Sequence, residues 1–161
     1  MNRWDWDIVL LIVNIVITFI SGVGALNSIY HFRRNRNIAN YAQANQALGE
    51  INKMLHRLPD VLMEINSVNT IKEIGKDLSD HLNVAMDAIP SDYSMAFRKL
   101  QKKNGFDLTH YINAIIEGRI LIYINNRATL DLHSFALCQE RLREMQEFLK
   151  KKMAEEKDKL K

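Results

Sequence analysis

The chain has 161 residues, 25% of them charged, and its formal net charge at pH 7 is +3. Roughly 130 residues follow the apolar segment near the amino terminus, which is enough for one modest domain and too few for two. A net charge this small does not by itself indicate long nucleic acid, although it suits contact with anionic lipid headgroups or a phosphorylated ligand. Only six glycines and two prolines occur, which favours long helices joined by few turns.

The first feature along the chain is an uncharged apolar run at residues 8–30, IVLLIVNIVITFISGVGALNSIY. A bilayer's hydrocarbon core requires about 20 apolar residues in a helix, and helices buried in soluble proteins rarely continue so far without a charge. Trp4 and Trp6 precede the run while Tyr30 and Phe32 close it, and such rings prefer the headgroup layer. The run therefore predicts one transmembrane helix.

A cleaved export signal is the alternative interpretation of this run. Residues 23–25, Val-Gly-Ala, form a tolerable small-residue cleavage pattern. Against a signal peptide, Arg3 is outnumbered by Asp5 and Asp7, and the apolar run is longer than usual.

The orientation of the span follows from a basic flank. Arg33, Arg34 and Arg36 come directly after the apolar run, and such residues stay on the cytoplasmic side of a membrane. We therefore expect residues 1–7 outside the inner (plasma) membrane and everything after His31 in the cytoplasm. The single cysteine of the chain agrees mildly with a reducing compartment.

A heptad pattern follows the basic flank. Apolar residues recur at alternating spacings of three and four, which is typical of a coiled coil or a bundle helix. The series is Tyr41, Ala44, Leu48, Ile51, Leu55 and Leu58, continued by Leu62 and Ile65. This seam can pair with copies of itself or with other helices of the same chain, and its direct attachment to a transmembrane helix favours self-association.

Two further helices are predicted after the heptads. Pro59 ends or kinks the heptad helix, because proline lacks a backbone donor and is tolerated only in the first turn. The next helix is expected at about 60–89. A short basic helix then runs to about residue 103, with Ser91 or Asp92 as its cap.

The last third of the chain is predicted as helix as well. Asn104-Gly105 marks a stop, and Asp107 can cap the helix that follows. The stretch Arg119–Ile124 has the composition of a strand, but no second strand is evident to pair with it, so we favour a helix that continues past Gly118. The last helix is expected to begin near Thr129.

The predicted fold is all-α: one amino-terminal transmembrane helix and a cytoplasmic helical bundle with coiled-coil character, in a homo-oligomer. Residues 1–7 form a short external segment, 8–30 the transmembrane helix, and 31–58 the basic flank and heptad helix. Residues 59–149 form the helical cytoplasmic domain. From residue 150 to 161 the chain is charged all round, and we expect a frayed, solvated helix end.

Chemistry-bearing motifs are scarce. Asp77 and His81 lie four apart on one helix face, but a third metal ligand at a suitable spacing is missing. Cys138 lies on an apolar face, where a buried structural thiol is the usual state. No phosphate-gripping glycine-rich loop, CxxC or HExxH motif occurs. The sequence therefore predicts no enzyme, no cofactor and no metal site.

A stripe of small and polar residues recurs inside the apolar run and is called the polar stripe below. Its members share one helix face and are Asn14, Thr18, Ser21, Ala25 and Ser28. Small residues let transmembrane helices approach closely, and amides and hydroxyls bond across the contact. The stripe marks a contact between the spans of an oligomer, the lining of a pore, or a single anchor with incidental small residues.

The polar stripe and the heptad seam do not share a face. Continuing the heptad frame backwards places the polar stripe on roughly the opposite side of one straight helix. We therefore expect either a helix break near residues 31–38 or a different role for one of the two contacts.

A cationic patch is the candidate ligand site. Arginine offers a fork of donors that matches phosphate, and asparagine can bond phosphate oxygens or base edges. The patch consists of Arg98, Lys99, Lys102, Lys103 and Asn104, together with Arg119, Asn125, Asn126 and Arg127. A solvated face or a contact with the anionic leaflet is the alternative. In a symmetric oligomer these cations would form a ring that suits a small cyclic polyanion.

The layout, with one amino-terminal span (IVLLIVNIVITFISGVG) and a small basic helical domain, resembles the short membrane-anchored effectors of type III CRISPR defence. The resemblance covers the whole chain as architecture, and no residue role is carried over from it. It implies a cyclic oligoadenylate ligand such as cyclic tetra-adenylate, a homo-oligomer such as a tetramer, and growth arrest of infected cells in antiviral defence. The alternative is a membrane-tethered scaffold that binds a protein partner and no small ligand.

Overall fold

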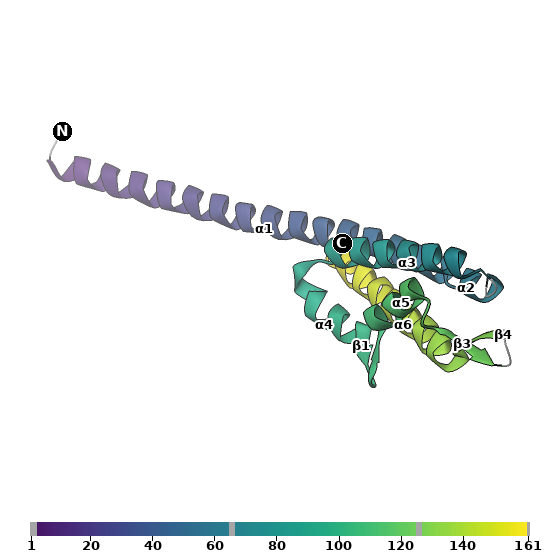
Figure 1. Ribbon diagram of the computed structural model, residues 1–161. Helices are drawn as coiled ribbons and strands as arrows, with labels where there is room; N and C mark the ends of the chain where they lie inside the picture. Colours follow the sequence, from purple (N-terminus) through teal and green to yellow (C-terminus); the bar gives the residue numbers. More distant parts are fainter. Residues whose placement is uncertain (1–2, 65–66, 125–126, 161) are drawn as a thin grey trace.

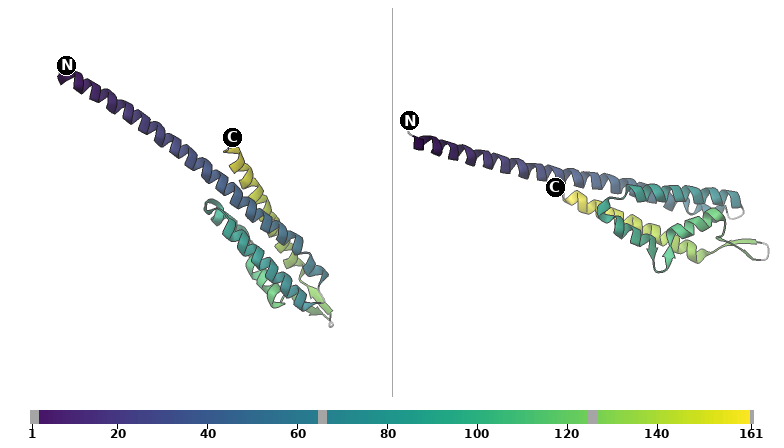
Figure 2. Two further views of the ribbon diagram at one scale, coloured as in Figure 1. Left: turned by 90° about the horizontal axis from the view of Figure 1, so that it is seen from above. Right: turned by 60° about the vertical axis from the view of Figure 1, so that its left-hand side comes forward.

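The computed structural model describes residues 3–64, 67–124 and 127–160, and most of them are helical (Figure 1). The first helix, α1 (Arg3–Arg57), runs without interruption from the amino-terminal end into a compact group of shorter elements. Its first half projects alone in every view, and its second half packs against the rest of the chain (Figure 2).

The projecting half of α1 has its apolar side chains exposed. Between Leu10 and Phe32 the large apolar residues are 45–72% exposed. In the described part of the chain α1 is the one helix long and apolar enough to cross a membrane, and this stretch of it is not buried by the protein. The prediction of a long apolar amino-terminal helix is confirmed, and the projecting half is not a core helix.

The other half of α1, together with the turn and α2 that follow it, carries a buried stripe with the predicted heptad period. Its spacings alternate between four and three, and its members are Asn40, Ala44, Ala47, Ile51, Met54, Leu58 and Val61. Every second position lies one residue earlier than predicted, so Ala47 and Met54 are buried where Leu48 and Leu55 were expected. Leu48 and Leu55 are partly buried against the same core, whereas Leu62 is exposed and Ile65 lies outside the described residues.

The partners of this seam come from the same chain. The seam packs against α3 (Val68–Ala88) and α6 (Leu132–Asp158). A helix break near residues 31–38 is wrong, because α1 continues regularly through them. The seam therefore serves the intramolecular contact, which the sequence had left open beside self-association.

The predicted helix at 60–89 is two helices. Pro59 starts α2 (Asp60–Met63), as expected, but α2 ends after one turn. The next helix, α3, begins only at Val68, where the Ser67 hydroxyl accepts a hydrogen bond from the Thr70 amide. The serine offers a side-chain acceptor to the unpaired amides of a helix start, which explains the new beginning.

The short basic helix α4 (Ser91–Gln101) ends two residues earlier than predicted. Lys102 and Lys103 form strand β1 (Lys102–Lys103), which pairs with β2 (Phe106–Asp107). The predicted stop is confirmed, because Asn104 and Gly105 adopt positive φ angles of 54° and 76° in the turn. The predicted cap is wrong: Pro90 occupies the cap position, without a side-chain hydrogen bond.

Helix α5 (Leu108–Glu117) begins as predicted and ends sooner. The Asp107 carboxylate accepts hydrogen bonds from the amides of Thr109 and His110, at 3.0 and 3.2 Å. At the other end Gly118 takes a left-handed conformation, with a φ of 74°, that closes the helix. The prediction that the helix continues through Ile124 is therefore wrong.

The segment after Gly118 is a hairpin. Strand β3 (Leu121–Ile124) pairs antiparallel with β4 (Arg127–Leu130). The partner strand is the stretch that was assigned to the start of the last helix, so α6 begins at Leu132 and not near Thr129. With two short hairpins, the fold is mostly helical and not all-α.

Helix α6 follows α1 along much of the bundle and remains helical to Asp158. Its buried side includes Phe135, Cys138, Leu142 and Met145. The expectation of a frayed, solvated end is wrong, because Glu156 is only 3% exposed. The carboxyl-terminal end of α6 lies beside the middle of α1, where the projecting half begins (Figures 1 and 2).

Candidate functional site

The structure divides the predicted cationic patch. Arg98 and Lys99 lie on the exposed last turn of α4. Lys102 forms an ion pair with Asp107 at 3.0 Å, and Lys103 forms one with Glu144 of α6 at 2.6 Å. These two lysines therefore help to fix the first hairpin.

The remaining members of the patch lie on either side of α5. Arg119 pairs with Glu117. Asn104 forms part of the turn between β1 and β2, and Arg127 is the first residue of β4. Asn125 and Asn126 lie outside the described residues. The cationic patch stays a prediction, with Arg119 as its one described member on the wall of the cavity below.

The polar stripe faces away from the rest of the protein. All five of its residues are exposed, and the hydroxyl of Thr18 donates to the carbonyl of Asn14 on the same helix at 2.8 Å. Two of the alternatives that the sequence left open, an oligomer contact and a pore lining, concern a partner outside the single chain, and the third is a single anchor with incidental small residues.

Asp77 and His81, the pair that resembled two metal ligands, bond to side chains of α1 instead. Asp77 accepts a hydrogen bond from Arg57 at 3.3 Å, and His81 bonds Glu50 at 2.7 Å. Both interactions join α3 to α1. Within the described residues no group of three histidine, cysteine, aspartate or glutamate side chains could hold a metal ion.

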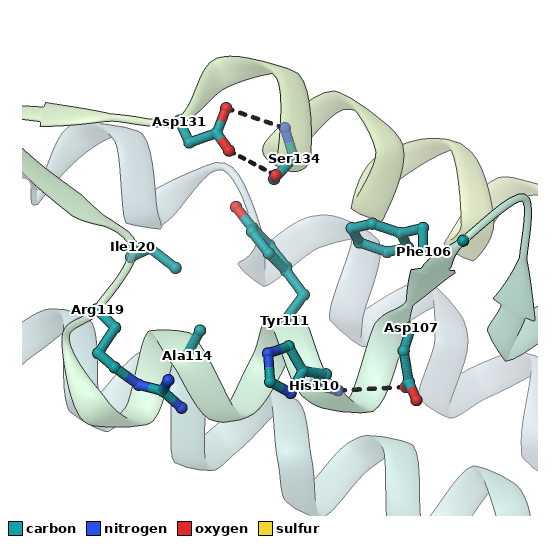
Figure 3. A pocket seen from close by; sticks show the side chains of 10 residues that line it. Phe106, Asp107, His110, Tyr111, Ala114, Arg119, Ile120, Asp131 and Ser134 are labelled. Atoms are coloured by element: carbon teal, nitrogen blue, oxygen red, sulfur yellow. Dashed lines mark hydrogen bonds between the residues drawn. The ribbon is translucent and has the colours of Figure 1, made fainter.

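A cavity of about 320 Å³ lies between α5, the start of α6 and the segment that leads into β3. Phe106, Asp107, Tyr111, Ile120 and Asp131 contribute to its walls, and Figure 3 shows them around a common space. The two helix starts that border the cavity are both capped by an aspartate. The Asp107 cap was predicted from the sequence but the cavity was not, since its walls come from three elements between Gly105 and Ser134 whose packing no local pattern shows.

Tyr111 is the notable polar group of this cavity. Its side chain is only 6% exposed, and its hydroxyl has no hydrogen-bond partner within the described residues. Figure 3 shows the hydroxyl pointing toward the corner formed by Asp131 and Ser134. Burial raises the pKa of Tyr111, so the phenol is a neutral donor at pH 7.

Asp131 is held as a carboxylate. Its pKa is lowered by the Ser134 hydroxyl, which donates to it at 2.5 Å, and further by the amides of Ser134 and His133. At the opposite wall the rings of Phe106 and Tyr111 lie 5.6 Å apart at 45°. The cavity thus combines an aromatic wall, an unsatisfied donor and a fixed carboxylate, which suits binding of a small molecule with an apolar body and polar edges.

Two further groups at or near the cavity, Asp107 and Cys138, are held in fixed protonation states. Burial alone raises the pKa of Asp107, but its bonds with Lys102 and with the amides of His110 and Thr109 outweigh burial and lower that pKa. Burial raises the pKa of the Cys138 thiol, which keeps it protonated and unreactive. The arrangement therefore supports binding.

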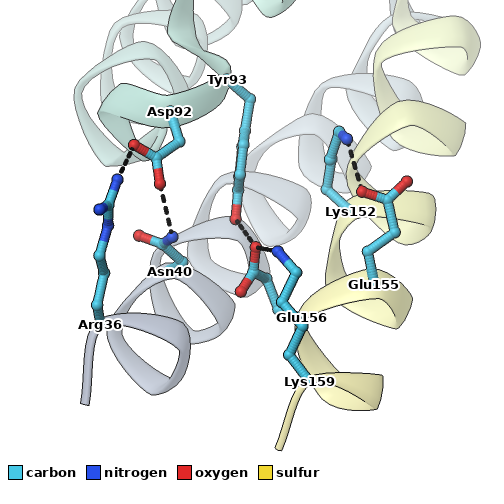
Figure 4. A network of polar contacts seen from close by, with 8 residues as sticks. All are labelled: Arg36, Asn40, Asp92, Tyr93, Lys152, Glu155, Glu156 and Lys159. Carbon is cyan, nitrogen blue, oxygen red and sulfur yellow. Dashed lines mark hydrogen bonds and ion pairs between the residues drawn. The ribbon is translucent and has the colours of Figure 1, made fainter. Parts of the chain in front are cut away.

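A second polar cluster joins three helices near the middle of α1 (Figure 4). Asp92, at the start of α4, accepts from Arg36 and, at 3.2 Å, from Asn40. The Arg36 bond lowers the pKa of Asp92 most strongly. These contacts fix α4 to α1 just beyond the projecting half.

The carboxyl-terminal end of α6 is held in the same cluster. The Tyr93 hydroxyl donates to buried Glu156 at 3.4 Å, and Lys159 donates to the same oxygen at 2.8 Å. Sequence analysis missed this cluster, because it assigned Asp92 to a cap and Glu156 to a solvated tail.

The fold and these contacts define a mostly helical protein with one helix long enough and apolar enough to cross a membrane. Comparison with protein-family models, with curated proteins and with solved structures finds no match. The functional conclusion therefore depends on geometry and chemistry.

Proposed function

We propose that this protein is a single-pass inner-membrane receiver, with its amino terminus outside and its helical bundle in the cytoplasm. In this proposal a small ligand binds the bundle, and the resulting change reaches the transmembrane helix. The observation that carries the proposal is the continuity of α1. One helix supplies both the exposed apolar stretch and the buried seam of the bundle.

The route from ligand to membrane follows the packing. The cavity borders the start of α6, where Asp131 and Ser134 form part of its wall. Helix α6 packs along α1, and near its far end Glu156 accepts a hydrogen bond from Tyr93 of α4. A ligand that shifts the start of α6 therefore acts on α1. Since α1 has no break between bundle and span, a shift or rotation is transmitted along it.

The narrower form of the proposal concerns the ligand and the outcome. The resemblance in layout favours a phosphorylated, cyclic nucleotide ligand and an effector that disrupts the membrane in antiviral defence. A homo-oligomer joined through the polar stripe would bring several copies of the cationic patch around one axis. Arg119 connects the two ligand hypotheses, because it belongs to the patch and lines the cavity.

The test of binding uses the full chain in lipid nanodiscs. Cyclic tetra-adenylate, other cyclic nucleotides and adenosine are added in turn, and the melting temperature is measured. The variant is Tyr111→Phe, which removes a hydroxyl that has no partner among the described residues and should leave the melting temperature without ligand unchanged or higher. Tyr41→Phe, on α1 and far along the chain from the cavity, is the matched control.

The receiver proposal expects a rise in melting temperature with one member of the panel, lost in Tyr111→Phe and kept in Tyr41→Phe. It also expects that the same compound releases a dye from liposomes that contain the protein. If the whole panel leaves both measurements unchanged, while a protein partner co-purifies with the bundle, the scaffold alternative replaces the receiver.

Membrane anchoring is tested separately. We expect the full chain to remain in the membrane after alkaline carbonate extraction, and a reporter fused at Lys161 to be active only in the cytoplasm. Release of a shortened protein, or reporter activity outside, would support a cleaved export signal.

A further inference from the structure

A second cavity lies where the end of α6 meets α1. The cavity has a volume of about 310 Å³ and is lined by Tyr30, Arg33, Arg34, Asn37, Lys159 and Leu160. The continuous series of large exposed apolar residues ends at Phe32, and the next one, Ile38, follows the three arginines of the basic flank. From Tyr30 to Asn37 an α-helix rises about 10 Å, so this segment extends across one headgroup layer, which is about 5–8 Å thick. With the span in a bilayer, the cavity lies at the depth of the lipid phosphates.

The charges around the cavity favour an anion. Arg33 and Arg34 are exposed and form no ion pair with any described residue. Lys159 bonds one oxygen of Glu156 at 2.8 Å and still presents other donor hydrogens. Arginine donors match phosphate oxygens in pairs, and the Asn37 amide can add a further donor.

The apolar members of the cavity suit a lipid more than a free anion. Tyr30 is 60% exposed at the end of the apolar stretch, and Leu160 is partly exposed at the end of the opposite helix. A tyrosine ring at this depth contacts both the acyl region and the headgroup. The cavity therefore has cationic and amide groups for a phosphate, with apolar side chains beside it.

We infer that this cavity binds the phosphate group of an anionic phospholipid of the inner leaflet. The bound headgroup joins α1 to the carboxyl-terminal end of α6, next to the bonds that Arg36 makes with Asp92 and Glu156 makes with Tyr93. The inference requires a span in the bilayer, as in the proposed function, but it requires neither the Tyr111 cavity nor a nucleotide ligand.

The test uses the purified full chain in detergent with added phosphatidylglycerol or phosphatidylcholine. Native mass spectrometry measures the bound lipid, and the melting temperature reports the stabilisation. We expect preferential retention of phosphatidylglycerol. Each cation near a membrane surface contributes about 1 kcal/mol, which corresponds to about fivefold in affinity. Lys159→Gln should therefore weaken phosphatidylglycerol binding about fivefold, and the double variant Arg33→Gln/Arg34→Gln about 25-fold.

The matched control is Arg98→Gln/Lys99→Gln, which removes two exposed cations from α4, outside the cavity. It should bind phosphatidylglycerol as the unchanged protein does. Lys159→Gln also leaves the basic flank intact, so a loss of binding in this variant is not a consequence of altered membrane orientation. The melting temperature in phosphatidylcholine verifies that each variant is folded.

Three outcomes would overturn the inference: equal retention of the two lipids, an equal loss in the α4 control, or the same stabilisation by inorganic phosphate or glycerol phosphate without lipid. The last result would assign the cavity to a free phosphate compound. If the protein resists carbonate extraction but shows no lipid preference, the lipid site is refuted while the membrane anchor stands. If carbonate releases the protein, the anchor itself fails.

Discussion

The two halves of α1 share one backbone and differ in nearly everything else. Ile17 in the projecting half is 55% exposed, whereas Ile51 in the bundle half is fully buried. The projecting half is apolar around its whole circumference, apart from the polar stripe, and the bundle half confines its apolar residues to one seam. The difference shows that the distribution of apolar residues around a helix, and not their presence, decides whether the chain itself or a lipid must cover them.

The largest expected effect is on the free energy of unfolding, and it should differ between Ile51→Ala and Ile17→Ala. Ile51→Ala should lower the free energy of unfolding by about 2–5 kcal/mol, since it leaves a cavity in the core of the bundle. Ile17→Ala should change it by less than about 0.5 kcal/mol, because the residue contacts nothing in the protein. Chemical denaturation in detergent, followed by circular dichroism, measures both. An equal loss in the two variants would mean that the projecting half is packed against protein.

A glycine in the bundle provides the next comparison. A side chain at Gly75 would lie 2.8 Å from the backbone nitrogen of Ile116 in α5, so α3 and α5 can approach only because this residue is glycine. Gly75→Ala should destabilise the bundle by about 1–3 kcal/mol. Gly49→Ala meets no atom within 4 Å and should stabilise α1 by up to about 1 kcal/mol. Thermal melting of both variants checks the opposite signs.

A glycine-to-alanine substitution in the projecting half can test for a contact between the spans of an oligomer. Gly24 also has no atom within 4 Å in the single chain. Gly24→Ala should therefore leave the melting temperature unchanged while any oligomer formed through the spans is weakened. Crosslinking in membranes measures the oligomer, and an unchanged oligomer would place the contact elsewhere.

A smaller effect is expected at the start of α6. Asp131→Ala removes the cap of the helix that covers the α1 seam and should cost about 1 kcal/mol at pH 7. Because folding lowers the pKa of Asp131, its stabilisation is complete above the unfolded value of about 3.8 and is lost as the pH falls through the folded pKa. The difference between the two proteins should therefore disappear in strong acid. A difference that does not shrink as the pH falls below about 3.8 would show that packing, and not the carboxylate, is responsible.

The smallest effect concerns the junction of the two halves. Asp92→Asn weakens the bond to Arg36, an exposed ion pair, and should cost about 0.2–1 kcal/mol. Glu147→Gln, which weakens the exposed pair with Lys150 within α6, is the control. Hydrogen exchange of the first turn of α4 should increase only in Asp92→Asn.

The period of the α1 seam was predictable, but its phase was not. Ala47 and Leu48 are adjacent apolar residues, as are Met54 and Leu55, and either member of each pair fits alternating spacings of three and four. Which member is buried depends on the side chains of α3 and α6 that lie opposite. The seven-residue repeat thus follows from the sequence, and the choice within each pair follows from tertiary packing.

The second hairpin shows why strand pairing escapes sequence patterns. The segment Leu121–Ile124 has the composition of a strand, but its partner Arg127–Leu130 does not, because it contains arginine and alanine. Residues 127–130 therefore form a strand because they pair with β3, and not because of their own composition. The start of α5 at Asp107 and the turn at Asn104 were easier to predict, because one residue decides each of them.

The contacts of the candidate sites could not be predicted from the sequence, because they join residues that are far apart in it. Asp92 and Arg36 are 56 positions apart, and Tyr93 and Glu156 are 63 apart, so no local pattern joins them. The same is true of Tyr111 and Asp131 in the cavity. The cationic patch was visible as a run of like charges, but the acidic residues that neutralise Lys102 and Lys103 became apparent only in the folded chain.

With the proposed span in a bilayer, the unbroken α1 would also make the bundle sensitive to the thickness of that bilayer. A transmembrane helix adapts to a thinner bilayer by tilting, and tilts of about 20° are common. Because α1 has no hinge at the membrane surface, the bundle must swing through the same angle as the span. A change in acyl-chain length on the lipid side would then appear on the aqueous side as a change in how close the bundle lies to the headgroups.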